Sequence, residues 1–166
     1  MNLPAHQFLD ERGIPYQRLT FAADTEKGAA SVARALGLKP AQMVKTLIFE
    51  SGDAECVLVM LAGDQNAVSG HLKRAIGSRN IRLAEPDTVR QVTGYEIGSI
   101  PPFHWQPAGF RSFVDATLMK EDLLGVGAGV WGQEIMITPE NLAEASQAVI
   151  VNLTDRTKPV VCADGL

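Results

Sequence analysis

The chain has 166 residues, of which 46% are hydrophobic, 20% charged and 6% aromatic. This length and composition are typical of one globular domain, and they exclude an intrinsically disordered chain, a collagen-like repeat and a disulfide-stapled mini-protein. Fifteen Lys and Arg against nineteen Asp and Glu give a net charge of −4, which excludes a protein that coats nucleic acid by bulk positive charge.

The N-terminal part of the sequence predicts helices alternating with strands. Asn2 is suited to cap a first helix, and Gly13 is placed to end it. A strand over 14–21, a helix over 29–36 and two strands over 44–50 and 54–61 are expected next. The turn Ser51-Gly52-Asp53 predicts that the last two strands form a hairpin, and their nearly continuous apolar character predicts that both faces are covered.

The rest of the sequence predicts shorter elements. Ser69 is expected to cap a helix, Gly94 to end a second one, and Thr138 to cap a third. Strands are expected over 81–83, 110–115, 123–126, 133–137 and 148–153. Because no repeat, linker or break in composition divides the chain, we expect one α/β domain over 1–166, with a mixed sheet of six or seven strands, several short helices and a polar tail from 154 to 166 that frays.

Membrane, secreted and metal-binding classes are excluded by what the sequence lacks. Its longest apolar stretch, 56–62, is far shorter than the ~20 residues that span a bilayer. The N-terminus carries no signal-peptide pattern, so we expect a cytoplasmic protein without membrane contact. Two cysteines are too few for a disulfide framework, and with the three histidines they show no metal-ligand spacing, so no metal is expected.

Cofactor motifs are also missing. The sequence has neither a phosphate-binding Gly-x-x-x-x-Gly-Lys-Ser/Thr loop nor a Gly-x-Ser-x-Gly nucleophile elbow. Gly125, Gly127, Gly129 and Gly132 form a glycine-rich segment, but a dinucleotide-binding loop needs a following helix and no helical pattern follows. A tight β-hairpin is therefore favoured, and no cofactor is expected.

Lys45 is an unusual residue for its place in the sequence. Side chains alternate along a strand, so Lys45 shares a face with Leu47 and Phe49. A lysine on an apolar strand face either extends its ammonium group to water or lines a pocket that holds an anionic or carbonyl group. The residues alone leave both interpretations open.

The segment 94–103 contains two glycines and two adjacent prolines and predicts a stiff, irregular loop. Such a loop either forms a structural turn or presents backbone N–H groups to a ligand. Asp115 lies in an apolar strand, and its carboxylate needs a partner, which is either a nearby loop or a ligand amine.

Basic residues are concentrated between His71 and Arg90, where five Lys or Arg stand against two Asp or Glu and give a local charge of +3. Such a cluster is either a solvated helical face or a modest phosphate-contacting patch. We refer below to Lys73, Arg74, Arg79 and Arg82 as the basic patch.

Several stretches together resemble the YbaK family, the free-standing relatives of the editing domain of bacterial prolyl-tRNA synthetases. They are the lysine strand 43–49, the Gly-x-x-x-Pro loop within 94–103, and segments 113–118, 126–129 and 137–139, and the similarity runs from about 5 to 153. The resemblance implies a mixed, barrel-like α/β sheet and hydrolysis of mischarged aminoacyl-tRNA. The family commonly has glycine after the Pro-Phe pair, whereas His104 and Trp105 stand here.

The resemblance also implies a set of site residues. Lys45, Gly98 and Ser99 would be catalytic, with Lys45 and the Gly98–Pro102 loop positioning the 3′-terminal adenosine and the ester for water attack. The basic patch would contact tRNA. Substrate-binding positions would be Phe21, Thr46, Ile100, Pro101, Pro102, Phe103, Asp115, Gly127, Ala128 and Gly129.

The implied partner is the 3′ acceptor end of an aminoacyl-tRNA, together with a transient complex with prolyl-tRNA synthetase. The edited amino acid stays open among alanine, cysteine, serine and threonine. A non-catalytic module that binds a nucleotide or a tRNA end is the alternative. A third interpretation, a hydrolase that uses Cys56, is disfavoured because Cys56 shares a strand face with Leu58 and Met60.

Overall fold

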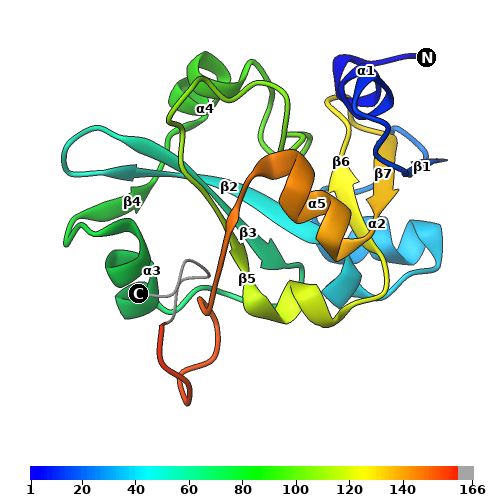
Figure 1. The fold of residues 1–166 in the computed structure, drawn as a ribbon. Helices are drawn as coiled ribbons and strands as arrows, with labels where there is room; N and C mark the ends of the chain where they lie inside the picture. The colour runs from blue at the N-terminus through cyan, green and yellow to red at the C-terminus, as the bar shows by residue number, and fades with distance from the viewer. Residues whose placement is uncertain (161–166) are drawn as a thin grey trace.

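The computed structural model describes residues 1–160, which fold into five α-helices, two short 3-10 helices and eight strands (Figure 1). The helices are α1 (Pro4–Glu11), α2 (Ala29–Leu36), α3 (Ser69–Ile76), α4 (Pro86–Thr93) and α5 (Pro139–Ser146), with η1 (Pro40–Gln42) and η2 (Ala116–Lys120). The strands are β1 (Gln17–Thr20), β2 (Val44–Ser51), β3 (Cys56–Ala62), β4 (Ile81–Leu83), β5 (Ser112–Asp115), β6 (Leu124–Gly127), β7 (Gln133–Ile137) and β8 (Val149–Val151).

The strands form two sheets and not the single sheet that the sequence predicts. The larger sheet has the order β4-β2-β3-β5-β8 and is mixed, because β3, β5 and β8 run parallel while β2 is antiparallel to β3 and β4. The smaller sheet, β1-β7-β6, is antiparallel. One parallel bridge, Met43 to Gly125, connects the two sheets. The fold is therefore α/β as expected, but the described residues form two open sheets, and a barrel-like closure is not observed.

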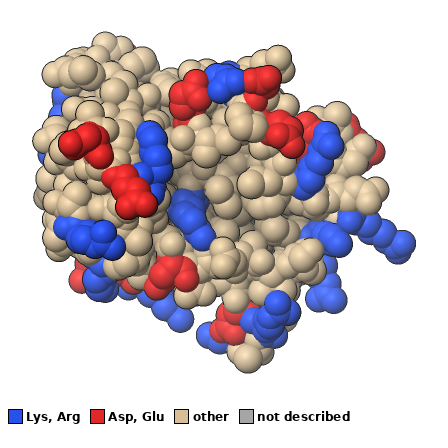
Figure 2. All heavy atoms as spheres, turned by 180° about the vertical axis from the view of Figure 1, so that it is seen from behind, with Lys and Arg blue, Asp and Glu red and all other residues tan. Residues whose placement is uncertain are grey.

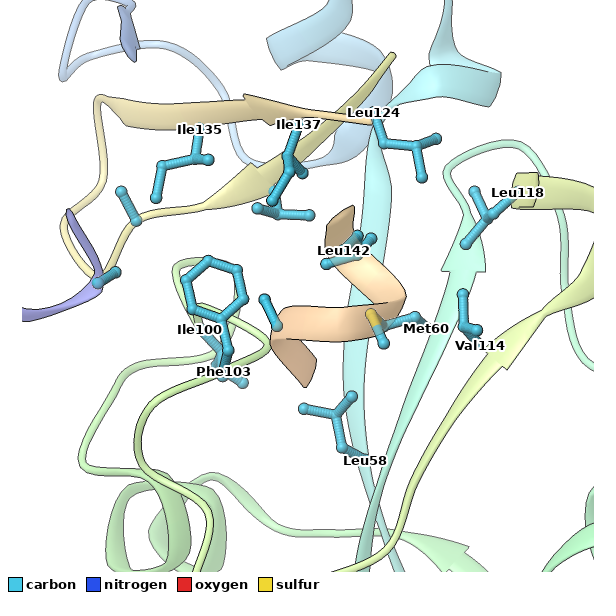
Figure 3. Packing of buried hydrophobic residues seen from close by; sticks show 14 of the residues in the cluster. Leu58, Met60, Ile100, Phe103, Val114, Leu118, Leu124, Ile135, Ile137 and Leu142 are labelled. Atoms are coloured by element: carbon cyan, nitrogen blue, oxygen red, sulfur yellow. The ribbon is translucent and has the colours of Figure 1, made fainter. Parts of the chain in front are cut away.

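The main core lies between the two sheets (Figure 3). Ile135 and Ile137 of β7 point toward Leu58 and Met60 of β3, and Leu142 of α5 fills the space between them. These side chains are at most 2% exposed, so they are the residues whose truncation would be most costly for stability. The hydrophobic effect of burying these side chains holds the two sheets together.

A second apolar layer covers the other face of the larger sheet. Leu72 and Ile76 of α3 pack on Val57, Val59 and Leu61 of β3. Because odd-numbered residues of β3 face α3 and even-numbered residues face the main core, the strand is apolar at every position. The predicted two-sided burial is thus confirmed for β3, whose six residues from Val57 to Ala62 are all buried.

Local end signals are partly confirmed. The Thr138 hydroxyl accepts a hydrogen bond from the Asn141 N–H, and Gly94 ends α4 in the left-handed conformation. The cap predicted at Ser69 is wrong: Ser69 is already helical, and the preceding Val68 is extended because its N–H donates to Leu153 O. Asn2 likewise lies one residue too early to cap α1.

Two further expectations concern the β6–β7 turn and the ends of the chain. The glycine-rich segment connects β6 to β7 as a hairpin, as predicted.

Within residues 1–160 no helix has both the length and the apolar character needed to cross a membrane. The Asn152 amide donates to the carbonyls of Asp155 and Lys158, which folds the chain after β8 into turns. Residues 161–166 of the predicted tail, including Cys162, lie outside the described residues.

Candidate functional site

One cavity of about 380 Å³ gathers chain segments that are far apart in the sequence. Its walls come from the start of β2, the N-terminal half of α2, the loop before β5, and the facing strands β6 and β7. Five of the residues predicted for the site line it: Lys45, Thr46, Gly98, Ile100 and Gly127. Tertiary folding therefore places the lysine strand and the Gly-x-x-x-Pro loop on opposite walls of the same space.

Lys45 is half-buried at the entrance to this cavity. Its ammonium group donates to Gln65 O and, over 3.3 Å, to Asn66 Oδ1 in the loop after β3. Burial lowers the pKa of Lys45 from its usual value, while Asp64 opposes this change. Simple extension into solvent does not describe this lysine, because protein oxygens hold its ammonium group beside the cavity.

The edge of β2 beside the cavity has no strand partner among the described residues. β4 pairs with β2 only over Phe49–Ser51, and the bridge to the smaller sheet ends at Met43. At this edge, Ile48 O accepts a hydrogen bond from Ala84 N. Residues two apart in a strand direct their backbone N–H and C=O groups to the same edge, so those of Thr46 also point to this edge of β2. The Thr46 hydroxyl is also buried without a partner. The backbone N–H and C=O of Thr46 are thus the two polar groups that this free edge offers to a ligand.

The Gly98–Pro102 loop is held rigidly against the opposite wall. Gly98 has φ of 95°, a left-handed backbone that favours glycine. The Trp105 indole donates to Pro101 O over 2.6 Å, and the Gln106 amide donates to Pro102 O over 2.8 Å. These two hydrogen bonds brace the loop from the side that faces away from the cavity.

Gly127 of β6 permits the close approach of this loop. A Cβ at Gly127 would lie 2.9 Å from the carbonyl carbon of Ser99, which is closer than real Cβ contacts, and 3.1 Å from Ile100 O, which is tighter than most of them. Any side chain here would push the loop away from the small sheet. Gly127 therefore sets the width of the cavity on this side.

The structure explains part of the departure at His104. Its φ of 81° is left-handed, the conformation for which glycine is the usual residue. The strain is offset by a 2.5 Å hydrogen bond between His104 Nε2 and the Tyr95 hydroxyl and by a tilted contact with Phe8. Burial lowers the pKa of His104, which favours a neutral ring that can accept this bond. His104 supports the back of the loop and does not line the cavity.

Glu134 of β7 is a cavity residue that the sequence analysis missed. It is 9% exposed, and burial raises its pKa to about 8. The described residues supply its carboxyl with no hydrogen bond or ion pair. In the sequence, the one indication of this residue is an acid inside the largely apolar segment 133–137. Only the pairing of Glu134 with Gly127 in the structure reveals that Glu134 faces the cavity.

The rim of the cavity carries a cation and aromatic rings. The Lys27 ammonium lies 3.8 Å from the centre of the Trp131 ring, a distance typical of a cation–π contact. Phe21 packs edge-on against Trp131 with ring centres 4.9 Å apart. Phe21 thus supports the rim through Trp131 and does not line the cavity itself.

Other predicted site residues lie behind the cavity walls. Phe103 and Ala128 are fully buried in the main core, and Gly129 packs against the Tyr95 ring. Ser99 is 5% exposed, and its carbonyl faces Gly127. These residues shape the site from outside the space that a ligand can occupy.

Asp115 does not line the cavity, and its carboxylate is hydrogen-bonded to residues of the neighbouring loops. Its carboxylate accepts from Leu153 N at 2.7 Å, from the Thr154 hydroxyl at 2.9 Å, and from the N–H and hydroxyl of Thr117. Asp115 is 0% exposed. Of the two partners that the sequence leaves open, the structure shows the nearby loops, and nothing in the geometry of the cavity supports the predicted substrate-binding role of Asp115.

The basic patch lies at the other end of β2 from the cavity. Lys73, Arg79 and Arg82 line a shallow groove beside Glu50, with which Arg82 forms an ion pair, and Arg74 lies in the last turn of α3. Figure 2 shows Lys and Arg interspersed with Asp and Glu around a hollowed, largely uncharged surface. This face of the molecule therefore presents no broad positive field.

Two negative expectations concern the cysteine and metals. Burial raises the pKa of the Cys56 thiol, and the neighbouring Glu50 and Glu55 add to this effect, which disfavours the reactive thiolate. Cys56 also lies away from the cavity, beside Pro107–Phe110. Within residues 1–160 no group of His, Cys, Asp and Glu is arranged to hold a metal ion.

Comparison with protein families gives a match over most of the chain. Residues 9–145 match the family described as the aminoacyl-tRNA editing domain. In the prolyl-tRNA ligase of Desulforamulus reducens, a segment covering 13% of that enzyme is 35% identical over 77 residues.

Two relatives and one solved structure are similar over nearly their whole length. A multifunctional Ser/Thr-tRNA deacylase, ProXp-y of Escherichia coli K12, is 28% identical over 87% of both chains. A protein of Enterococcus faecalis described as a Cys-tRNA(Pro)/Cys-tRNA(Cys) deacylase, EbsC, is 22% identical over 92% of this chain and 93% of its own. A crystal structure described as a trans-editing enzyme for prolyl-tRNA synthetase superposes with a TM-score of 0.80 at 25% identity, covering 92% of this chain and 98% of that one.

Proposed function

This chain belongs to the aminoacyl-tRNA editing domain family, and from that premise we propose that it is a deacylase that hydrolyses the ester of mischarged tRNA in trans, with Lys45 and the Gly98–Pro102 loop positioning the substrate. The observation that carries the proposal is the single cavity that combines Lys45, the free edge of β2 and this loop. The relatives are named for Cys-tRNA and Ser/Thr-tRNA, which supports a small amino acid as the substrate, and the similarity to prolyl-tRNA ligases supports tRNA(Pro) as its carrier. Alanine is a further candidate from the resemblance described above.

The proposed chemistry requires positioning more than a strong nucleophile. An aminoacyl ester is already activated, so oriented donors and a placed water supply a useful fraction of the barrier reduction. Lys45 would bind the terminal nucleotide or its phosphate, while the Thr46 N–H and the backbone of the Gly98–Pro102 loop would bind the ester and ribose oxygens. Water would then attack the ester carbonyl. A triad of Ser, His and Asp is not needed for this route.

Selection of the amino acid would follow from the size of the cavity. One methylene group changes binding by only about 1–3 kcal/mol, so a synthetase cannot reject every smaller analogue at one site. A separate cavity that admits only small side chains can remove the products that pass. Gly127 and the rigid loop against it would fix the wall that makes this selection.

The encounter with tRNA is proposed to be weak and brief. The net charge is −4, and the basic patch is small and partly neutralised by Glu50. Few phosphate contacts give low affinity and a shallow salt dependence. A transient complex with prolyl-tRNA synthetase in the cytoplasm would compensate by delivering the mischarged tRNA before it dissociates.

The proposal is tested by measuring release of free amino acid from tRNA(Pro) charged with Ala, Cys, Ser or Thr. Wild-type protein should deacylate at least one of these, and Lys45→Ala should lose at least about 100-fold in kcat/KM. Asn66→Ala is the control, because it removes one acceptor of the Lys45 ammonium and keeps the ammonium itself.

Two results would contradict the proposal. A Lys45→Ala variant with a native circular dichroism spectrum and full activity would exclude the role of Lys45. A protein that binds charged tRNA but releases no amino acid from any of the four would indicate the non-catalytic binding module instead.

A further inference from the structure

Glu134 stands out because it is a buried acid that faces a cavity without a partner. The side chains of Ile135 and Ile137 point from β7 into the main core (Figure 3). Because side chains alternate along a strand, Glu134 points to the other face of β7, where the cavity lies. It is 9% exposed. Within residues 1–160 no side chain or backbone N–H donates to its carboxyl.

Such a residue is costly unless it serves a ligand. Taking a carboxyl out of water without a hydrogen-bond donor opposes folding, and acids are rarely buried unless they are paired. An isosteric glutamine or an apolar residue would avoid part of this cost. The burial of Glu134 beside an open cavity therefore suggests that the missing donor arrives with the ligand.

The position of Glu134 identifies which part of an aminoacyl ester it can reach. Glu134 pairs directly with Gly127 across the β6–β7 ladder, and Gly127 contacts the backbone of Ser99 and Ile100. The carboxyl thus lies one strand away from the loop that is proposed to hold the ester. In an aminoacyl ester the α-amino group is attached to the carbon next to the ester carbonyl, so a carboxyl beside the bound ester can reach it.

We propose that Glu134 binds the α-amino group of the aminoacyl ester and so restricts the enzyme to esters that carry a free amine. This inference rests on the proposed deacylase function and specifies the recognition group of the same cavity. A charged donor paired with a desolvated carboxylate is among the stronger hydrogen bonds in proteins.

The protonation states agree with this role. Burial raises the pKa of Glu134 to about 8, so the free protein holds this carboxyl largely neutral at pH 7. The other charged residues that line the cavity within the described chain are Lys27 on the loop before α2 and Lys45 on β2. Lys27 lies over Trp131 and Lys45 is bound to Gln65 O, so neither pairs with Glu134. Binding an ammonium group should therefore ionise Glu134 and release one proton to solvent.

The test compares two esters of the same tRNA, one aminoacyl and one with a hydroxyl in place of the α-amine. Wild-type protein should prefer the aminoacyl ester. Glu134→Gln should lower kcat/KM for the aminoacyl ester by about 10- to 100-fold and change that for the hydroxyacyl ester by less than 3-fold. Glu140→Gln, the same substitution at an exposed position in α5, should change neither.

Each alternative result has a defined meaning. Equal losses on both esters would mean that Glu134 acts on the ester itself, and unchanged rates on both would mean that it contacts neither group; either result overturns the proposal. If wild-type protein deacylates no aminoacyl-tRNA, the proposed function fails instead.

A binding measurement on the wild-type protein covers the case in which Glu134→Gln does not fold. Calorimetry with a non-hydrolysable 3′-aminoacylamino adenosine should show at least about 10-fold tighter binding than with its deamino analogue. Repeating the titration in buffers of different ionisation enthalpy should show release of up to one proton. Equal affinities, or no proton release, would overturn the proposal.

Discussion

Asp115 and Glu134 are two buried carboxyl groups with opposite surroundings. Asp115, at the end of β5, accepts hydrogen bonds from Leu153, Thr154 and Thr117 and joins two parallel strands to the turn that follows them. Glu134, the second residue of β7, receives no donor from the described residues and faces a cavity. Both lie in apolar strands, so their sequence contexts are alike.

The difference shows how to separate a structural acid from a binding acid. A buried acid whose acceptors are filled by its own chain stabilises the fold, because each donor would otherwise be unsatisfied. A buried acid with free acceptors beside a cavity destabilises the fold and is retained for a ligand. Of the four experiments that follow, the first two test this contrast directly, and the other two test the cavity wall and the basic patch.

Replacing Asp115 should have the largest effect on stability. In Asp115→Asn an amide N–H₂ faces donors that now lack an acceptor, so we expect a loss of about 3–4 kcal/mol in the free energy of unfolding. Urea denaturation measures this loss, with Asp122→Asn as the exposed control. A loss below about 1 kcal/mol would show that the Asp115 contacts do not stabilise the fold as described.

Glu134→Gln should instead stabilise the protein, and increasingly so at higher pH. Between pH ~4.5 and 8 the folded protein keeps a proton on Glu134 that the unfolded chain releases, so wild-type stability falls as pH rises through this window. The variant lacks this dependence and should gain on the order of 2–3 kcal/mol relative to wild type between pH 5 and pH 8. Thermal unfolding at both pH values measures the gain. The same gain at both pH values would indicate that Glu134 is ionised throughout in the folded protein.

Gly127→Ala should change the shape of the cavity while removing no side chain that could bind the substrate. The added methyl group collides with the backbone of Ser99 and Ile100, so the loop must shift. We expect kcat/KM for deacylation to fall about 10-fold, equivalent to ~1.4 kcal/mol. Gly70→Ala is the matched control, because a Cβ there meets no atom within 4 Å. Equal activities of the two variants would mean that the loop position does not matter for the reaction.

The basic patch should give the smallest effect. Reversing the charges of Lys73 and Arg74 should raise KM for charged tRNA about 3-fold, below 1 kcal/mol, and reduce the slope of its salt dependence. Steady-state kinetics between 50 and 200 mM salt, a range over which phosphate contacts change affinity measurably, test this. Lys120→Glu, an exposed charge reversal outside the patch, is the control. Identical slopes for wild type and variant would make the patch an ordinary solvated surface.

Local signals in the sequence predicted the elements well and the sheets poorly. Strand and helix positions follow from periodicity and turn residues, so β2, β3 and α2 lie within two residues of their expected bounds. The sequence does not indicate that 17–20, 124–127 and 133–137 form a sheet of their own. Pairing between strands that are distant in sequence is decided by the packing of α5 and the main core.

The candidate site divides in the same way. Lys45 and the Gly98–Pro102 loop were predicted because a lysine in an apolar strand and a loop with two glycines and two prolines are unusual on their own. Asp115 was placed in the site and Glu134 was missed, because both are single acids in apolar strands and nothing local tells them apart. Only the donors around Asp115 and the cavity beside Glu134 separate them.

By itself, the sequence determined the class of the protein, the order of its elements and the two motifs that resemble an editing domain. These features depend on residue type and short-range spacing, which a linear chain displays directly. The tertiary structure decided which polar groups remain without a partner and face a common cavity. That property depends on segments that are far apart in the sequence, such as those of Lys45 and Glu134, lining the same cavity, and they do so only after the two sheets have packed together.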